Sequence, residues 1–239
     1  MGLRDLELGD QAVHDGNVGE DFAAALETPG SALPDRTQAG EALERLALQL
    51  GAVTGAQTDR MTRDDGWRLL SIGRHVERLG FLAASLDLAL DAGALADDAG
   101  FEAMLALFDS SISFRAQFQQ SREMLALVDL LVLNRDNPRS LAWVAHTLRG
   151  RLAKLAGSEP NELSPMSLQV PDPAQWDLAQ LCTPVPATGD GAQDADAPLA
   201  WPQLVQVLAH CGAAAHAVSE LISATYFTHS GASEQSVGA

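Results

Sequence analysis

Three charged residues within one short stretch are the first candidates for chemistry. Arg74, Glu77 and Arg78 lie in the segment from Met61 to Leu90, where the spacing of apolar residues predicts a helix. Guanidinium groups bind carboxylates and phosphates through paired N–H donors, and a carboxylate can serve as a general acid or base. The stretch therefore predicts either an anion-binding site or an acid/base site.

Two charged side chains, Glu77 and Arg115, are expected to be buried. On a helical wheel, Glu77 falls in the middle of a second apolar stripe, formed by Leu70, Phe81, Ala84 and Leu88. Arg115 falls between the directions of Phe108 and Ile112 on the next predicted helix, so we expect it to point inward as well. Because an unpaired buried charge costs several kcal/mol, we expect Glu77 and Arg115 to pair.

Two interpretations of the charged residues stay open. In the first, they form a structural ion-pair network that fixes the register of the helices. In the second, surplus guanidinium groups bind a carboxylate or phosphate ligand, and Glu77 is the catalytic candidate if the chain is an enzyme. The candidate ligand-binding residues are Arg74, Glu77, Arg78, Arg115 and Arg139.

Other reactive residue types give weaker signals. His75 falls on the outer side of its helix and is expected at the surface. His210, Cys211 and His216 share the last predicted helix, but a six-residue step places the two histidines on different faces. Helical bundles that bind two metal ions use Glu-x-x-His pairs, which this sequence lacks. We therefore expect neither a metal site nor a cofactor.

The elements that must position these residues are predicted to be helices throughout. Apolar residues recur at spacings of three and four, which predicts an all-α fold, an antiparallel bundle of about six main helices. Asn137 and Pro138 are expected to start the fifth helix and Gly157 to end it. Gly73 and Gly80 are expected to let a second helix approach closely. The helical stripes lie near residues 37–59, 62–90, 101–115, 121–133, 138–157 and 204–226.

The predicted domain boundaries follow from acidic segments and from sequence rich in Pro and Gly. Residues 1–36 are predicted to be an acidic, poorly ordered segment, residues 37–229 a single helical domain, and residues 230–239 a disordered tail. An acidic connection rich in Pro and Gly, at about residues 157–198, interrupts the domain. We expect this connection and residues 1–35 to be mobile, or the connection to act as a lid.

The overall charge narrows the range of partners. The formal net charge is -17, and Lys154 is the only lysine. Nucleic acids and anionic membranes require a basic face, so neither is expected as a partner. We expect no membrane span, because Arg, Asp or Glu is expected to interrupt the apolar stretches well short of the roughly 18–20 residues that a span needs. With two cysteines and no recognisable leader, the chain is expected to be cytoplasmic with free thiols.

Three motifs together resemble a known bacterial family, the alpha-E domain. They are Gly66–Arg78 (G-W-R-L-L-S-I-G-R-H-V-E-R), Ser111–Arg115 (S-I-S-F-R) and Val128–Leu141 (V-D-L-L-V-L-N-R-D-N-P-R-S-L). The resemblance covers residues 43–155 best and extends to Tyr226. Its arginine and glutamate signature maps onto Arg74, Glu77 and Arg78. Members usually carry a second G-R-x-x-E-R motif, so this chain resembles the C-terminal part of a longer protein.

The resemblance implies a context rather than a reaction. Alpha-E proteins resemble accessory partners of a circularly permuted ATP-grasp amide-bond ligase and often occur near a transglutaminase-like peptidase. It favours a non-catalytic accessory or binding domain in peptide or small-molecule tailoring. If the arginine cluster serves a ligand, a peptide or a carboxylate is expected. The alternative is an enzyme that uses Glu77 as acid or base in an arginine-lined pocket.

Overall fold

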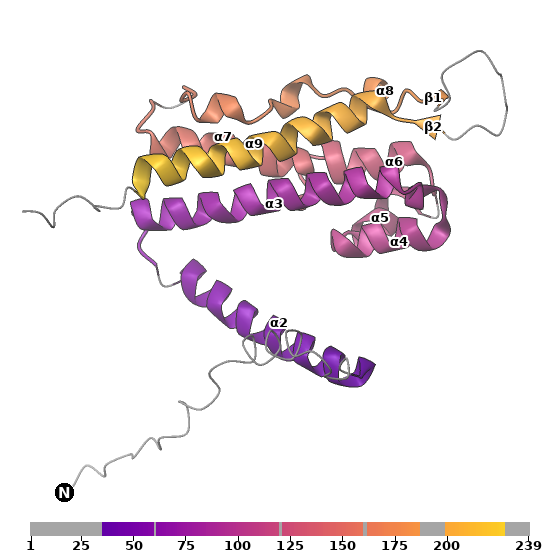
Figure 1. Cartoon of the computed structure of the whole chain (residues 1–239), viewed down its shortest axis with the longest axis horizontal. Coiled ribbons are helices and arrows are strands. Elements are labelled where there is room, and N and C mark those ends of the chain that lie inside the picture. Colours follow the sequence, from indigo (N-terminus) through magenta and orange to yellow (C-terminus); the bar gives the residue numbers. More distant parts are fainter. Residues whose placement is uncertain (1–34, 60, 120, 160–161, 187–198, 228–239) are drawn as a thin grey trace, which may run out of the picture. The chain divides into compact units, whose positions relative to one another are not determined.

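The described part of the chain is built almost entirely from helices, as the sequence predicts (Figure 1). A computed structural model of the protein describes residues 35–59, 61–119, 121–159, 162–186 and 199–227. The long helices are α2 (Arg36–Asp59), α3 (Asp65–Asp91), α7 (Leu141–Leu155) and α9 (Pro202–Tyr226). The all-α class is therefore confirmed.

Shorter elements connect the long helices. Between α3 and α7 lie η1 (Ala94–Ala96), α4 (Asp98–Leu107), α5 (Ser111–Phe118), α6 (Met124–Val128) and the π-helical turn η2 (Asp129–Leu133). Between α7 and α9 lie η3 (Ser167–Gln169), η4 (Pro173–Gln175), α8 (Leu178–Leu181), β1 (Val185–Pro186) and β2 (Leu199–Ala200). The two short strands pair antiparallel, with Val185 opposite Ala200.

The chain divides into two units, Met1–Thr62 and Arg63–Ala239. In the first unit, α2 confirms the helix predicted near residues 37–59. Its apolar stripe is exposed: Leu43, Leu46, Leu50 and Val53 have 64%, 41%, 57% and 52% of their surface accessible. The single domain predicted over residues 37–229 stays a prediction.

Helix α3 is the central element of the second unit. Its side chains Ile72, Val76, Leu79, Ala83 and Leu86 recur at helical spacing and are buried. They pack against α7 and α9, which lie beside α3 in Figure 1. The helix is capped by the side chain of Asp64, which accepts a hydrogen bond from the backbone N–H of Trp67 at 3.0 Å.

Helix α9 covers α3 along most of its length. A Cβ added at Gly80 would lie 3.5 Å from the Cβ of Ala215, so this glycine lets the two helices approach closely, as predicted. The expectation that charged residues interrupt every apolar stretch too soon for a membrane span was wrong for α9. The helix is long and apolar enough to cross a membrane by length and composition alone. In the structure one of its faces, which includes Leu204, Leu208 and Val218, is buried in the core of the bundle.

The helix predicted over residues 101–115 is broken in two. Asp109 has φ 46°, in the left-handed region, and it separates α4 from α5. Asp adopts this conformation more readily than most residues. A break at a single residue leaves the apolar spacing nearly unchanged, so the spacing did not reveal it. Ile112, expected to continue the buried stripe, is 86% exposed.

The start of α7 also differs from the prediction. Ser140, rather than Asn137, caps the helix by accepting a hydrogen bond from the backbone N–H of Trp143 at 3.1 Å. Asn137 is buried and donates from Nδ2 to the carbonyl of Leu130 at 3.0 Å. Its role is therefore to tie the turn before α7 to the π-helical turn η2. The predicted stop at Gly157 is confirmed, because its φ of 70° is left-handed.

Residues 162–186 pack onto the bundle, which corrects the expectation of a mobile connection. Val170 is fully buried, and Leu181 and Cys182 are also buried. The hydroxyl of Ser167 donates to the carbonyl of Arg149 at 2.9 Å. Residues 1–34, 187–198 and 230–239, which were expected to be mobile or disordered, lie outside the described residues.

Candidate functional site

Glu77 lies at the surface of α3 and not in the core, so the burial prediction was wrong. The second apolar stripe around it is itself left at the surface: Phe81 is 53% exposed and Leu88 is 69% exposed. The helices of the second unit bury the stripe that contains Ile72 and Leu79. A wheel therefore identified an apolar face correctly but could not show that this face stays exposed.

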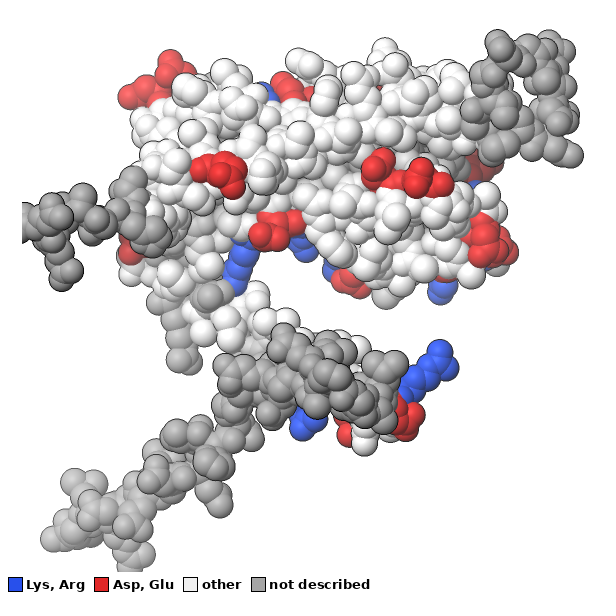
Figure 2. All heavy atoms as spheres, in the orientation of Figure 1, with Lys and Arg blue, Asp and Glu red and all other residues white. Residues whose placement is uncertain are grey.

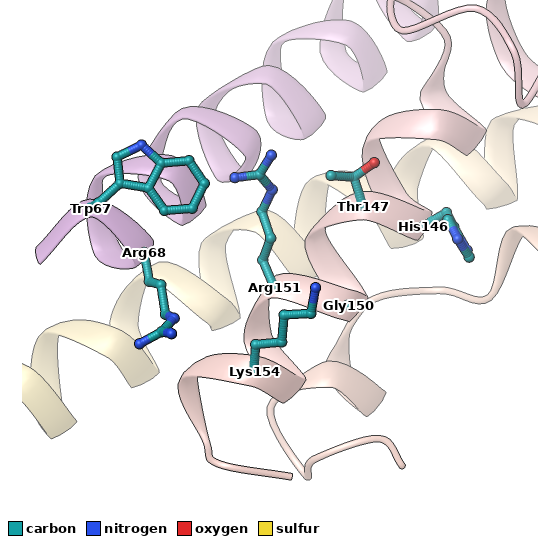
Figure 3. Close-up of a pocket in the computed structure, with 7 residues that line it drawn as sticks. All are labelled: Trp67, Arg68, His146, Thr147, Gly150, Arg151 and Lys154. Atoms are coloured by element: carbon teal, nitrogen blue, oxygen red, sulfur yellow. The ribbon is translucent and has the colours of Figure 1, made fainter. Parts of the chain in front are cut away.

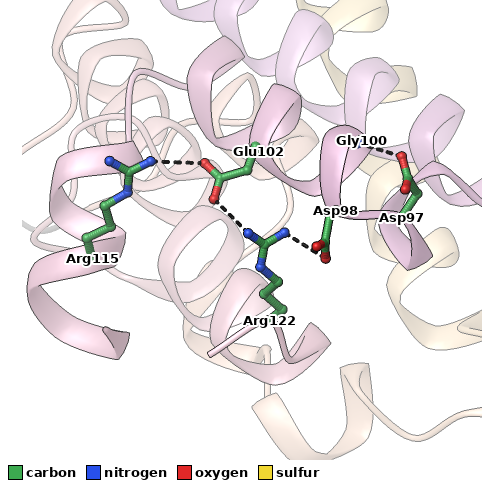
Figure 4. A network of polar contacts seen from close by, with 6 residues as sticks. All are labelled: Asp97, Asp98, Gly100, Glu102, Arg115 and Arg122. Carbon is green, nitrogen blue, oxygen red and sulfur yellow. Dashed lines mark hydrogen bonds and ion pairs between the residues drawn. The ribbon is translucent and has the colours of Figure 1, made fainter. Parts of the chain in front are cut away.

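Arg115 belongs to a different network from the one expected (Figure 4). Its Nη2 lies 3.4 Å from Oε2 of Glu102, and its side chain is 69% exposed. Arg122 reaches the same carboxylate at 3.6 Å and Asp98 at 2.7 Å. The predicted pair between Glu77 and Arg115 is thus not formed, because the break at Asp109 turns Arg115 away from the direction that a continuous helix would give it.

Two of the predicted arginines meet the turn before α7. Nη1 of Arg78 forms a long hydrogen bond, 3.5 Å, to the carbonyl of Pro138. The neighbouring Arg139 pairs through Nη2 with Oδ2 of Asp109 at 2.5 Å. These contacts link α3, the turn before α7 and the α4–α5 break. The ligand-binding role of Arg74, Glu77, Arg78, Arg115 and Arg139 stays a prediction.

Glu77 borders a groove between α3 and α9 with a volume of about 430 Å³. The groove is mainly apolar, and Ser219 and Ser223 bring hydroxyl groups to it. No arginine lines it, so the arginine-lined pocket expected at Glu77 is not present among the described residues. Its other lining residues are Gly66, Leu69, Leu70, Gly73, Val76, Ile222 and Phe227.

A second pocket, between α3 and α7, is basic and was missed by the sequence analysis (Figure 3). Its volume is about 380 Å³. Helix α3 contributes Trp67 and Arg68, and the remaining lining residues come from α7: His146, Thr147, Gly150, Arg151 and Lys154. Residues 147, 151 and 154 repeat at spacings of four and three, so a wheel of α7 could have placed them on one face.

Two guanidinium groups lie over the indole ring of Trp67, beside this pocket. The guanidinium carbon of Arg63 lies 4.2 Å from the centre of the indole ring, and that of Arg151 lies 5.3 Å from it. Arg151 also donates from Nη1 to the hydroxyl of Ser71. Burial lowers the pKa of the Arg151 guanidinium from its ordinary value, and the positive charge of Arg63 lowers it further.

His75 is half-buried and lies close to this region, rather than at the surface as expected. Its ring stacks on Trp143 with centroids 5.8 Å apart. Nδ1 lies 2.7 Å from the carbonyl of Ser71, which fixes Nδ1 as the donor, whereas the buried Nε2 has no hydrogen-bond partner among the described residues. Burial lowers the pKa of His75, and the nearby arginines, Arg151 first, lower it further, against the raising effect of the Ser71 hydrogen bond.

Both cysteines are free and buried. Burial raises the pKa of Cys211 to about 12. Burial and the charge of Asp129 raise the pKa of Cys182 to about 11. Both thiols are therefore protonated at neutral pH, which makes them poor nucleophiles. Across the described ranges, no group of three or more His, Cys, Asp or Glu side chains is arranged to hold a metal ion.

Comparison with known families gives one match that spans most of the chain. The Alpha-E family model, described as a predicted alpha-helical domain with a conserved ER motif, matches residues 17–227. Two Glu-Arg pairs occur in the sequence, at residues 44–45 and 77–78. Both residues of each pair are exposed.

Curated relatives are longer proteins. Proteins of Mycobacterium bovis (strain ATCC BAA-935 / AF2122/97) and of Mycobacterium tuberculosis strains CDC 1551 and H37Rv, each named only as uncharacterised, are 32% identical to this chain over 126 residues. The match covers 52% of this chain and 14% of each relative. No solved structure matches the chain.

Proposed function

Because this chain belongs to the Alpha-E family, we propose that it is a non-catalytic helical binding domain that acts with an ATP-grasp-type amide-bond ligase or a transglutaminase-like protein. The system it serves tailors peptides or small molecules, and its site of action is the cytoplasm. The choice of partner rests on the family resemblance. The choice of a binding role rests on the surface of α3.

One observation carries the binding role. Whichever of the two Glu-Arg pairs the family motif matches, both residues lie at the surface. A family motif that is not buried contributes little to packing and is better explained by recognition or chemistry. Glu77 of the second pair also borders the groove between α3 and α9, so a negative charge and apolar surface lie side by side.

The groove defines what the partner must present. An apolar side chain of the ligase would fill the space between Leu70, Val76 and Ile222. A lysine or arginine beside that side chain would pair with the exposed carboxylate of Glu77. Interfaces commonly combine an apolar centre with a charged rim in this way. We therefore assign the groove to a segment of the ligase that carries an apolar anchor next to a basic residue.

Calorimetric titration with the candidate ligase tests this assignment. Gly73 lines the groove, and a Cβ at this position would meet nothing within 4 Å, so Gly73→Leu fills the groove without disturbing the core. We expect Gly73→Leu and Glu77→Arg each to weaken binding by about tenfold or more. The control Glu123→Arg makes the same charge change at an exposed position that forms no capping hydrogen bond, and it should leave affinity within about twofold.

Two outcomes would contradict the proposal. The first is that neither an ATP-grasp-type ligase nor a transglutaminase-like protein from the same organism binds the chain. The second is that all three variants weaken binding equally, because that would mean overall charge or folding, and not the groove, determines the affinity.

A second candidate function, an enzyme that uses Glu77 as acid or base, is favoured by the solvent-open groove at that residue. Turnover of a peptide substrate by the chain alone, lost in Glu77→Gln, would support the enzyme and replace the binding role.

A further inference from the structure

The basic pocket between α3 and α7 is unusual in so acidic a chain. The formal net charge is -17, with 15 Lys and Arg against 32 Asp and Glu. Even so, Arg68, Arg151 and Lys154 line one pocket of about 380 Å³. No carboxylate lines it. Grouping like charges in one pocket costs free energy unless an anion offsets it.

Among the described residues, only Arg68 of these three cations forms an ion pair, although Lys154 also borders a second pocket lined by Glu159, Glu162 and Asp172. Asp65 pairs with Arg68 at 2.5 Å. Asp64 is engaged in capping α3. No ion pair within the described ranges involves Arg151 or Lys154. The pocket therefore presents two positive charges that have no ion-pair partner in the described part of the chain.

Arg151 is held in place before any ligand binds. Its guanidinium lies over Trp67 and donates one hydrogen bond to the hydroxyl of Ser71. A guanidinium has five N–H donors, so several remain for a ligand. A side chain already fixed by stacking and hydrogen bonding loses little conformational entropy on binding. Figure 3 shows the Arg151 side chain reaching from α7 towards Trp67 of α3.

We propose that this pocket binds a phosphate monoester dianion. Arg151 and Lys154 are three residues apart on α7, so their side chains emerge from neighbouring positions, about 5–6 Å apart at Cβ, and can reach one small group together. A phosphate monoester carries about -1.5 to -2 charges at pH 7, which matches two cations. The hydroxyl of Thr147 supplies a further hydrogen-bond donor. Gly150 also lines the pocket, and the space beside its Cα is empty to 4 Å from an added Cβ.

The surroundings argue for a small ligand that is not a nucleic acid. The net charge of -17 repels a long polyanion, whereas at about 0.1 M salt this repulsion is screened beyond about 10 Å and a local cluster dominates for a small anion. Trp67 already carries two guanidinium groups on its ring, which disfavours stacking of a nucleobase there. The site shares no residue with the groove at Glu77, so this inference does not rest on the proposed function.

Calorimetric titration of the full chain with O-phosphoserine tests the site. We expect 1:1 binding with a Kd of roughly 0.1–1 mM at about 0.1 M salt. Lys154→Gln removes one cation at an exposed position, and Gly150→Leu fills the pocket without changing charge. Each should weaken binding by about tenfold or more. Arg151→Lys should also weaken it, because lysine keeps the charge but loses the fork of donors.

Arg135→Gln is the matched control. Arg135 is exposed, does not line the pocket, and its loss changes the net charge as Lys154→Gln does. It should leave the affinity within about twofold. Circular dichroism melts of each variant will show whether it is folded. Tighter binding of a phosphoserine peptide than of phosphoserine would support the site and identify a protein as the carrier.

Three results would overturn the inference. They are no heat of binding up to about 10 mM O-phosphoserine, equal weakening by Arg135→Gln and Lys154→Gln, and binding of succinate as tight as that of O-phosphoserine. The last would show that the pocket selects two separate carboxylates rather than one doubly charged group.

Discussion

At the level of single residues, the exposure of Glu77 determines what its loss will cost. A carboxylate at the surface keeps its hydration in the folded state, so Glu77→Gln removes no buried pair. We predict a change in the free energy of unfolding within about 0.5 kcal/mol, measured by urea denaturation. A loss of about 2–5 kcal/mol would mean that Glu77 has a buried cationic partner after all.

His75 makes stability depend on pH. Its pKa is lowered in the folded state, chiefly by burial, so below the ordinary value of 6.5 the unfolded chain binds more protons than the folded one. The free energy of unfolding should therefore fall as the pH drops below 6.5. Denaturation curves at a series of pH values should show a smaller fall for His75→Phe.

His216→Gln is the control for that pH series. His216 is exposed on α9, so its replacement should leave the pH dependence of stability as it is in the native chain. An identical fall in stability for the native chain and for His75→Phe would contradict the role assigned to His75.

At the level of elements, glycines test how closely the helices pack. At Gly73 in α3 an added Cβ meets nothing within 4 Å. At Gly100 in α4 it would lie 2.1 Å from the carbonyl oxygen of Ala94. Gly73→Ala should stabilise the chain by about 0.5–1 kcal/mol, because alanine favours the helix. Gly100→Ala should destabilise it by about 1–3 kcal/mol, because backbone atoms must move apart.

Thermal melts of the two variants provide a matched comparison, since both replace a helical glycine by alanine. Shifts of the midpoint in the same direction would contradict the packing described for one of the two positions.

The helices themselves were largely predictable from the sequence, but their partners were not. Regular apolar spacing identified α3, α7 and α9, because each has one buried face. The break at Asp109 was missed, since a single left-handed residue leaves the apolar spacing nearly unchanged. The packing of residues 162–186 onto the bundle was not predicted, because buried residues such as Val170 do not recur there at helical spacing.

The candidate site was predictable only in part, for the same reason. The sequence identified Arg74, Glu77 and Arg78 on one helix but not which side of that helix stays uncovered. It missed the pocket at Trp67 and Arg151, because those residues lie 84 positions apart in the sequence and on different helices. Only the packing of α3 against α7 brings them together.

At the level of the whole molecule, negative charge is widespread and positive charge is local. Figure 2 shows acidic side chains spread over the face that it draws, with fewer basic ones between them. A strongly acidic surface disfavours non-specific association with nucleic acid. Recognition by this chain is therefore expected to depend on the few places where basic or apolar groups gather, the α3–α7 pocket and the α3–α9 groove.

Site-directed photo-crosslinking tests the central claim, that the α3–α9 groove receives the ligase, most directly. The native thiols, Cys182 and Cys211, are buried with raised pKa values, so a cysteine introduced at exposed Ser223 can be labelled selectively. Ser223 lines the groove, whereas Ala209 is exposed on the same helix roughly 21 Å away and does not line it. We predict that a photo-reactive label on Ser223→Cys crosslinks to the ligase and that the same label on Ala209→Cys does not. Equal crosslinking from both positions, or none from Ser223→Cys with a ligase that binds the chain, would contradict the account.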